Sequence, residues 1–106
     1  MPRLASIAAV LALLAQSALA DEVTNERRDE LRHLVLQDCG SCHGMTMKGG
    51  LGKALRPGDL TGLDEADLAD VILDGVPGTP MPPWRGLVSV SEAVWIARAL
   101  KTGEIQ

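Results

Sequence analysis

Residues 39–43 read Cys-Gly-Ser-Cys-His, and this motif constrains the fold more than any other feature of the sequence. Cys39 and Cys42 are three residues apart, so both thiols fall on one side of a helical turn, and His43 follows directly. The spacing is typical of covalent haem attachment, in which two thiols add to the vinyl groups of one macrocycle and the adjacent histidine binds the iron. It predicts one haem c, attached through Cys39 and Cys42, with His43 as an axial iron ligand.

Other uses of two close cysteines fit the sequence less well. A thioredoxin-type redox pair needs a βαβ context, and the chain has no such pattern. A zinc site that joined His33 to the motif would place the adjacent residues Cys42 and His43 on one metal, unlike the usual zinc spacings. A simple disulfide across the four-residue loop would leave His43 without a role.

The supply of large apolar side chains is small. The 106 residues include no Phe, no Tyr and two Trp, and a domain of this size buries only roughly 60% of its unfolded surface. Chains with so little core usually need a staple, a metal or a cofactor. A haem at the centre of the core meets that need.

We expect residues 1–20 to be a cleaved secretory signal peptide. Arg3 supplies a positive start, the following stretch is apolar as far as Ala15, and small residues occupy Ala18 and Ala20. The apolar stretch is shorter than the roughly 20 residues that span a membrane. Residues 21–106 would then form one monohaem domain without a membrane span, in an oxidising space outside the cytoplasm.

The chain is acidic, with a formal net charge of −4. Nucleic acid is not expected as a partner, because phosphate binding depends on clustered Lys and Arg. The charge is unevenly placed: residues 59–74 hold six acids and no base, whereas residues 39–58 and 75–91 hold only bases. Those bases are Lys48, Lys53, Arg56 and Arg85.

Three amphipathic helices are predicted, roughly over residues 24–38, 64–73 and 89–103. Their starts carry capping residues, with a capping-box pattern at Ser89, and glycines follow the second and third helices. No segment shows the alternation typical of strands. Residues 44–63 and 75–88 are rich in Gly and Pro and predict two long loops, which are uncommon in a compact domain unless they serve a function.

The second axial position of the iron has one strong candidate and one rival. Met81 lies between prolines, which stiffen the backbone and would present the thioether with little entropy to lose. Met45 and Met47 follow His43 too closely to reach the opposite haem face. His33 remains a rival, although an ordinary exposed histidine is the simpler interpretation, and an open or water-occupied position is the third possibility.

The two tryptophans lead to different expectations. Trp95 is in register with the apolar stripe of the third helix, which favours a place in the core. Trp84 follows the Met81 loop and either packs on the haem edge, donates a hydrogen bond to a propionate, or is ordinary packing.

The order of these elements resembles the class I c-type cytochromes. More narrowly, residues 42–52, 72–75 and 81–85 resemble the small periplasmic monohaem cytochromes encoded with the haem-d (cytochrome cd-type) nitrite reductase of denitrifying bacteria. The resemblance implies an all-α class I cytochrome c fold, three main helices and two long loops wrapped around one covalent haem. Members of this class often carry a proline whose carbonyl accepts the proximal histidine Nδ1–H. Here Lys53 stands in its place, so the carbonyl survives but the rigidity of a proline is lost.

The resemblance also implies a function. We expect a periplasmic one-electron carrier and not an enzyme, a monomer that donates electrons to the nitrite reductase or serves the maturation of its haem d. One alternative is a gas- or small-ligand-binding haem protein with a displaceable Met81, and another is a structural subunit stapled by its haem. If the two basic loops frame the haem edge, the partner should offer an acidic docking site.

Overall fold

The computed structural model describes residues 22–105. They form α2 (Asn25–Leu34), a π-helical turn η1 (Val35–Cys39), α3 (Gly40–His43), a 3₁₀ turn η2 (Pro57–Asp59), α4 (Glu65–Asp74) and α5 (Val90–Thr102). None of the described residues lies in a strand, so the all-α prediction is confirmed. The expected signal peptide, residues 1–20, lies outside the described residues.

All three main helices begin at the residues that the sequence indicated, and α4 and α5 also end there. The Thr24 and Asp64 side chains accept hydrogen bonds from backbone N–H groups in the first turns of α2 and α4. Ser89 and Glu92 form a reciprocal capping box at the start of α5, which satisfies two N–H groups that a helix otherwise leaves unpaired. Gly103 ends α5 in the left-handed conformation, with φ of 82°.

The first helical run is longer than predicted. It continues past Asp38 through η1 and α3 to His43, so the Cys-Gly-Ser-Cys-His motif is itself helical. Within η1 the N–H of Gly40 donates to the carbonyl of Val35, five residues earlier. A π turn inserts one residue into the helical repeat, which changes the direction in which the following side chains point.

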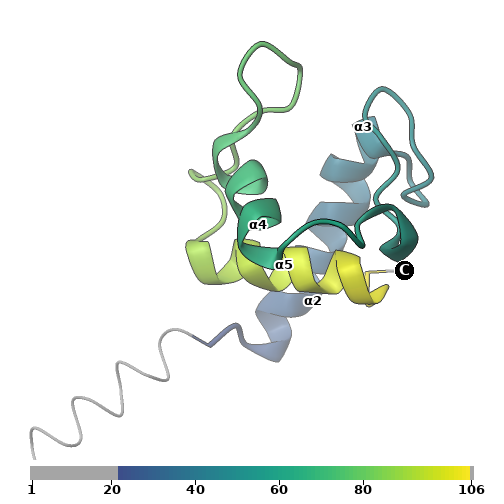
Figure 1. Ribbon diagram of the computed structural model, residues 1–106. Helices are drawn as coiled ribbons and strands as arrows, with labels where there is room; N and C mark the ends of the chain where they lie inside the picture. The colour runs from purple at the N-terminus through teal and green to yellow at the C-terminus, as the bar shows by residue number, and fades with distance from the viewer. Residues whose placement is uncertain (1–21, 106) are drawn as a thin grey trace, which may run out of the picture.

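The core lies where α4 packs along α5 and α2 crosses them (Figure 1). Trp95 is 8% exposed, which confirms its predicted place in the core, and its ring lies 5.6 Å from the Arg32 guanidinium carbon. Fully or almost fully buried side chains come from α2, η1, α4 and α5 and from the chain between α3 and α4. They are Leu31, Val35, Met47, Leu60, Leu73 and Ile96.

Both long loops stand on the same side of α5 (Figure 1). The loop that follows α3 carries residues 44–56, and the loop that follows α4 carries residues 75–89. The two predicted irregular segments are therefore present, with η2 as a short turn inside the first one. This arrangement places the two loops at one end of the molecule.

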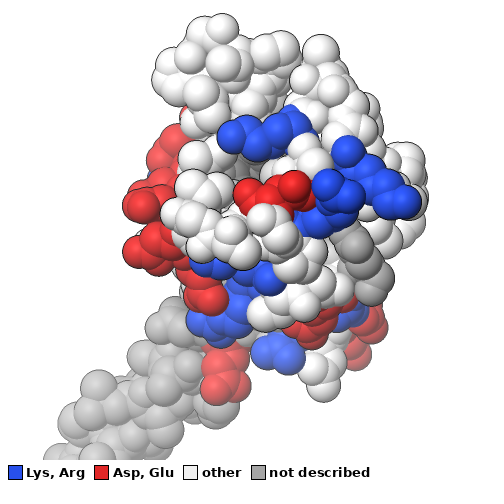
Figure 2. Space-filling model, turned by 45° about the vertical axis from the view of Figure 1, so that its right-hand side comes forward, with Lys and Arg blue, Asp and Glu red and all other residues white. Residues whose placement is uncertain are grey.

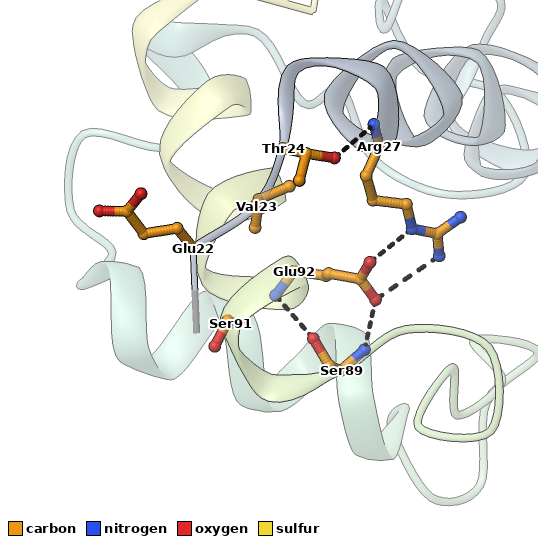
Figure 3. Close-up of a pocket in the computed structure, with 7 residues that line it drawn as sticks. All are labelled: Glu22, Val23, Thr24, Arg27, Ser89, Ser91 and Glu92. Atoms are coloured by element: carbon orange, nitrogen blue, oxygen red, sulfur yellow. Dashed lines mark hydrogen bonds and ion pairs between the residues drawn. The ribbon is translucent and has the colours of Figure 1, made fainter. Parts of the chain in front are cut away.

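The starts of α2 and α5 meet at the junction drawn in Figure 3. The Arg27 guanidinium forms an ion pair with Glu92, and the same carboxylate accepts from the backbone N–H of Ser89 at 2.8 Å. The hydrogen bond from that guanidinium holds the pKa of Glu92 below its ordinary value of 4.5. A hollow of about 390 Å³ lies at this junction and includes none of the predicted haem-site residues.

Among residues 22–105, no helix is both long enough and apolar enough to cross a membrane.

Candidate haem site

The two cysteines lie on the last helical turns before the loop, and both are free thiols. Each is partly buried, and Cys39 packs against the hydrophobic core. Gly40 between them is buried, and the space next to its Cα is filled by the side chains of Met45 and Met47. The helix therefore turns its glycine side to the following loop.

The Cys39 thiol is strongly shielded from water. Burial raises its pKa to about 11, and the negative charge of Asp38 adds to the shift. The thiol is therefore protonated at neutral pH, whereas the usual reactive cysteine is a thiolate with a lowered pKa.

His43 is held in one orientation by the loop that follows it. Its Nδ1 lies 2.7 Å from the Lys53 carbonyl oxygen. A carbonyl can only accept, so Nδ1 carries the proton and donates it, which leaves the Nε2 lone pair available for a metal. The hydrogen bond expected at Lys53 is confirmed, without the proline that often supplies it.

The loop is tied to the end of the helix by main-chain hydrogen bonds. The N–H of Gly52 donates to the Cys42 carbonyl and that of Gly49 to the His43 carbonyl, both at 2.8 Å. These are carbonyls that a helix end leaves without partners. Further along, Leu55 donates to the Met47 carbonyl at 2.9 Å. The loop is thus folded back onto the motif that it follows.

Met81 is partly buried on the loop after α4. Its carbonyl accepts from Val76 at 3.2 Å and its N–H donates to the Thr79 hydroxyl at 3.3 Å. Gly75, with φ of 66°, lies so close that a Cβ there would be 2.6 Å from the Met81 carbonyl oxygen. Beyond Met81, the N–H of Trp84 donates to the Ile72 carbonyl at 3.0 Å, which ties the loop to α4.

The rival ligands lie in less suitable places. Met47 is completely buried in the core with φ of 57°, and Met45 is 53% exposed. His33 is exposed on α2, and ten residues of helix separate it from His43, about 15 Å along the axis. Among the described residues no three His, Cys, Asp or Glu side chains gather in a way that could hold a metal ion.

The charged residues of the two loops differ in their partners. Arg56 pairs with Asp59 at 3.0 Å, and Arg85 pairs with Asp74 through two bonds of 2.9 Å. The Lys48 and Lys53 side chains are exposed, and neither contacts an acid among the described residues. Figure 2 shows Lys and Arg across the upper middle and right of one face, around one acidic patch, with Asp and Glu along its left edge and both kinds mixed lower down. The predicted asymmetry exists, but two of its four cations are neutralised.

The family described as "Cytochrome C oxidase, cbb3-type, subunit III" matches residues 26–98, more than two thirds of the chain. The chain belongs to the c-type cytochromes. It is 52% identical to cytochrome c55X of Paracoccus denitrificans over 97% of this chain and 100% of that protein. It is 53% identical to cytochrome c55X of Pseudomonas aeruginosa over 82% of this chain and 74% of that protein.

Two solved structures are also similar. The c-type cytochrome NirC matches with a TM-score of 0.77 and 51% identity, over 78% of this chain and 98% of that one. The dihydro-heme d1 dehydrogenase NirN, solved in complex with DHE, matches with a TM-score of 0.60 and 35% identity. That match covers 65% of this chain and only 15% of NirN. The predicted class I fold is confirmed by the first of these structures.

Family membership also settles the cofactor. A c-type cytochrome holds covalently bound haem c, and this chain has the two thiols and the adjacent histidine in the required order. The local structure fits the group, because the thiols are free and partly buried and the His43 Nε2 lone pair is unused. Relatives matched over most of their length are small cytochromes, so the chain carries electrons and is not an enzyme.

Sequence reasoning missed the two glycines that lie against the expected ligands. Gly52 approaches the His43 ring and Gly75 approaches the Met81 backbone. The sequence has 11 glycines, several of them in these loops, and no local pattern distinguishes these two from the rest. Only the folded arrangement identifies them.

Proposed function

We propose that this cytochrome is a periplasmic one-electron carrier whose iron is bound by His43 and Met81. The observation that carries the proposal is the His43 ring, which donates through Nδ1 to Lys53 and keeps Nε2 free. Haem c supplies one iron that accepts and releases a single electron. A thioether in the second axial position favours the ferrous state and raises the potential.

The residues of this chain have three tasks in that function. Cys39 and Cys42 would attach the macrocycle, His43 and Met81 would bind its iron, and the loops that carry them would hold these ligands in place. With both positions filled, no substrate reaches the metal. A carrier of this kind changes charge by one electron without a proton transfer or a bond broken at the iron.

We further propose that the redox partner belongs to the haem-d nitrite reductase system, as the reductase itself or as part of its maturation. The sequence motifs of residues 42–52 and 81–85 support this, as do the similarity to NirC and the partial match to a dihydro-heme d1 dehydrogenase. A cleaved signal peptide at residues 1–20, as the sequence predicts, would export the domain at 21–106 to the periplasm, where the chain would act as a monomer.

The proposed docking surface is the loop after α3. Lys48 and Lys53 are its exposed cations and have no acidic partner among the described residues, whereas Arg56 and Arg85 are paired. A partner with an acidic docking site would be steered toward this loop, and steering weakens as the Debye length falls below ~10 Å above 0.1 M salt.

The ferric absorption spectrum tests the ligation. A weak band near the red edge of the visible range is expected for methionine bound to iron. A high-spin spectrum would instead support the alternative, a gas- or small-ligand-binding haem protein with a displaceable Met81.

Stopped-flow electron transfer to purified haem-d nitrite reductase tests the partner. Lys48→Glu with Lys53→Glu should slow the reaction several-fold at low salt, within the range that steering produces. The matched control is Arg98→Glu with Lys101→Glu, which makes the same charge change on α5. Equal slowing in both double variants, or none in either, would argue against docking at this loop.

A further inference from the structure

Gly52 makes an unusually close approach to the His43 side chain. A Cβ built on Gly52 would lie 2.6 Å from Cε1, 2.7 Å from Nδ1 and 3.1 Å from Nε2 of the ring. Carbon atoms that are not bonded attract best at about 3.5–4.0 Å, so contacts this short are strongly repulsive. Any side chain at position 52 would therefore have to displace either the ring or the main chain.

Neither of them can move freely. The ring is fixed on one side by the 2.7 Å hydrogen bond from Nδ1 to Lys53, the residue directly after Gly52. The main chain is fixed by the 2.8 Å bond from the Gly52 N–H to Cys42, the residue directly before His43. The Gly52 carbonyl also accepts from Gly50 at 2.9 Å. Gly52 is thus hydrogen-bonded to Cys42, which precedes His43, and covalently joined to Lys53, which accepts the hydrogen bond from the His43 ring.

We infer that Gly52 is a positioning residue for the axial histidine. With the Lys53 carbonyl it forms a two-point holder: the carbonyl fixes the direction of Nδ1, and the bare Cα of Gly52 fixes the plane of the ring. This inference rests on the proposed role of His43 as an iron ligand. If the inference is right, one added methyl group at position 52 rotates the plane of the His43 imidazole ring while the ligands of the iron stay the same.

The test is Gly52→Ala in the haem-loaded protein, with two matched controls. Gly62→Ala makes the same change where no atom lies within 4 Å. Gly50→Ala disturbs the same loop, since its Cβ would be 2.8 Å from the Cys42 carbonyl oxygen, but its nearest atoms include none of the ring. The pair separates an effect on the ring from a general loosening of the loop.

The main measurement is the proton NMR spectrum of the ferric protein, because the paramagnetic shifts of the haem methyl groups depend on the orientation of the axial imidazole plane. Gly52→Ala should change the order or spread of these shifts, while Gly62→Ala and Gly50→Ala keep the wild-type pattern. The reduction potential of Gly52→Ala should also rise, since a weakened Nδ1–H bond to Lys53 makes the imidazole a poorer donor to ferric iron.

A wild-type shift pattern in Gly52→Ala would overturn the inference, and so would an equal change in Gly50→Ala. If Gly52→Ala yields no haem-loaded protein, Gly50→Ala decides: normal accumulation of that variant supports the inference, and its loss as well contradicts it. Failure of the proposed function is seen separately, because the wild-type spectrum would then lack low-spin histidine ligation before any glycine is changed.

Discussion

The two loops that approach the haem site hold their ligands in different ways. On the loop after α3 the structure fixes a side chain: the His43 ring has a hydrogen-bond partner at 2.7 Å and a glycine against it. On the loop after α4 it fixes only the main chain: Met81 is bonded through its carbonyl and its N–H, and its side chain is partly exposed. The His43 side chain is therefore already oriented as a ligand, whereas for Met81 only the position of the main chain is fixed.

This difference suggests which bond yields first when the protein is perturbed. Displacing His43 requires breaking its bond to Lys53 and shifting a loop tied to the helix end. Displacing Met81 requires only a rotation of its side chain.

Loss of both attachment cysteines should have the largest effect. Cys39→Ala with Cys42→Ala is expected to give no stable haem-loaded protein in the periplasm, because the chain has few large side chains to replace the macrocycle in its core. Absorbance and haem staining of periplasmic extracts would measure this. Ser41→Ala, in the same motif, should accumulate normally. Recovery of a folded, haem-free double variant would show that the core does not need the group.

Met81→Ala should have the next largest effect. We expect the six-coordinate low-spin iron to become high-spin or water-bound, and the potential to fall by more than ~0.1 V of the roughly 0.8 V that axial ligands span. His33→Ala should leave both unchanged, since that side chain is exposed on α2. Optical spectra and redox titration of the two variants provide the comparison. The reverse pattern would assign the second ligand to His33.

Features that depend on neighbouring residues could be predicted from the sequence, whereas features that depend on tertiary packing could not. Caps at Thr24, Asp64 and Ser89 could be predicted because capping depends on residues within one turn. The helical turn of the cysteine motif could be predicted from its spacing, but the π turn that joins it to the first helix could not, because a π turn depends on how the helix packs. The cysteine motif and Met81 were recognisable from spacing and proline context, whereas Gly52 acts through a contact formed only after the loop folds back.

The charge pattern illustrates the same limit. Basic and acidic residues form separate blocks in the sequence, which predicts a strong asymmetry. In the fold, Arg56 and Arg85 lie at the boundary of the acidic block and pair with Asp59 and Asp74. The Arg56–Asp59 pair is local, three residues apart, whereas the Arg85–Asp74 pair joins the loop to α4 and follows from tertiary structure. The sequence therefore overestimated the positive charge that the Met81 side presents.

Gly75→Ala should weaken the methionine side specifically. The glycine has φ of 66°, and a Cβ there would collide with the carbonyl oxygen of Met81 at 2.6 Å. Gly78→Ala is the control, because φ is 79° there but no atom lies within 4 Å. A positive φ is unfavourable for alanine in both variants, and Gly75 also has ψ of −168°, a backbone region that essentially only glycine adopts. Gly75→Ala should cost more in denaturant unfolding, and its iron should bind added imidazole about ten-fold more tightly. Equal affinities in the two variants would mean that the contact with Met81 has no influence on ligation.

The smallest predicted effect concerns the charges. Asp74→Asn removes the partner of Arg85 and leaves a free cation on the Met81 side, so the two loops become more alike in charge. Electron transfer to an acidic partner should become faster at low salt, by about two-fold, and the gain should vanish at high salt.

The same substitution should also change the acid unfolding of the protein. The hydrogen bond from Arg85 lowers the pKa of Asp74 from its ordinary value of 3.8. The wild-type pair therefore contributes to stability above that value and loses its contribution as the pH falls through the lowered pKa. Asp74→Asn should flatten this part of the acid unfolding curve. Asp67→Asn, on the same helix and without an ion-pair partner among the described residues, makes the same charge change and is the control. A rate increase of the same size in both variants would mean that total charge, and not the release of Arg85, sets the encounter rate.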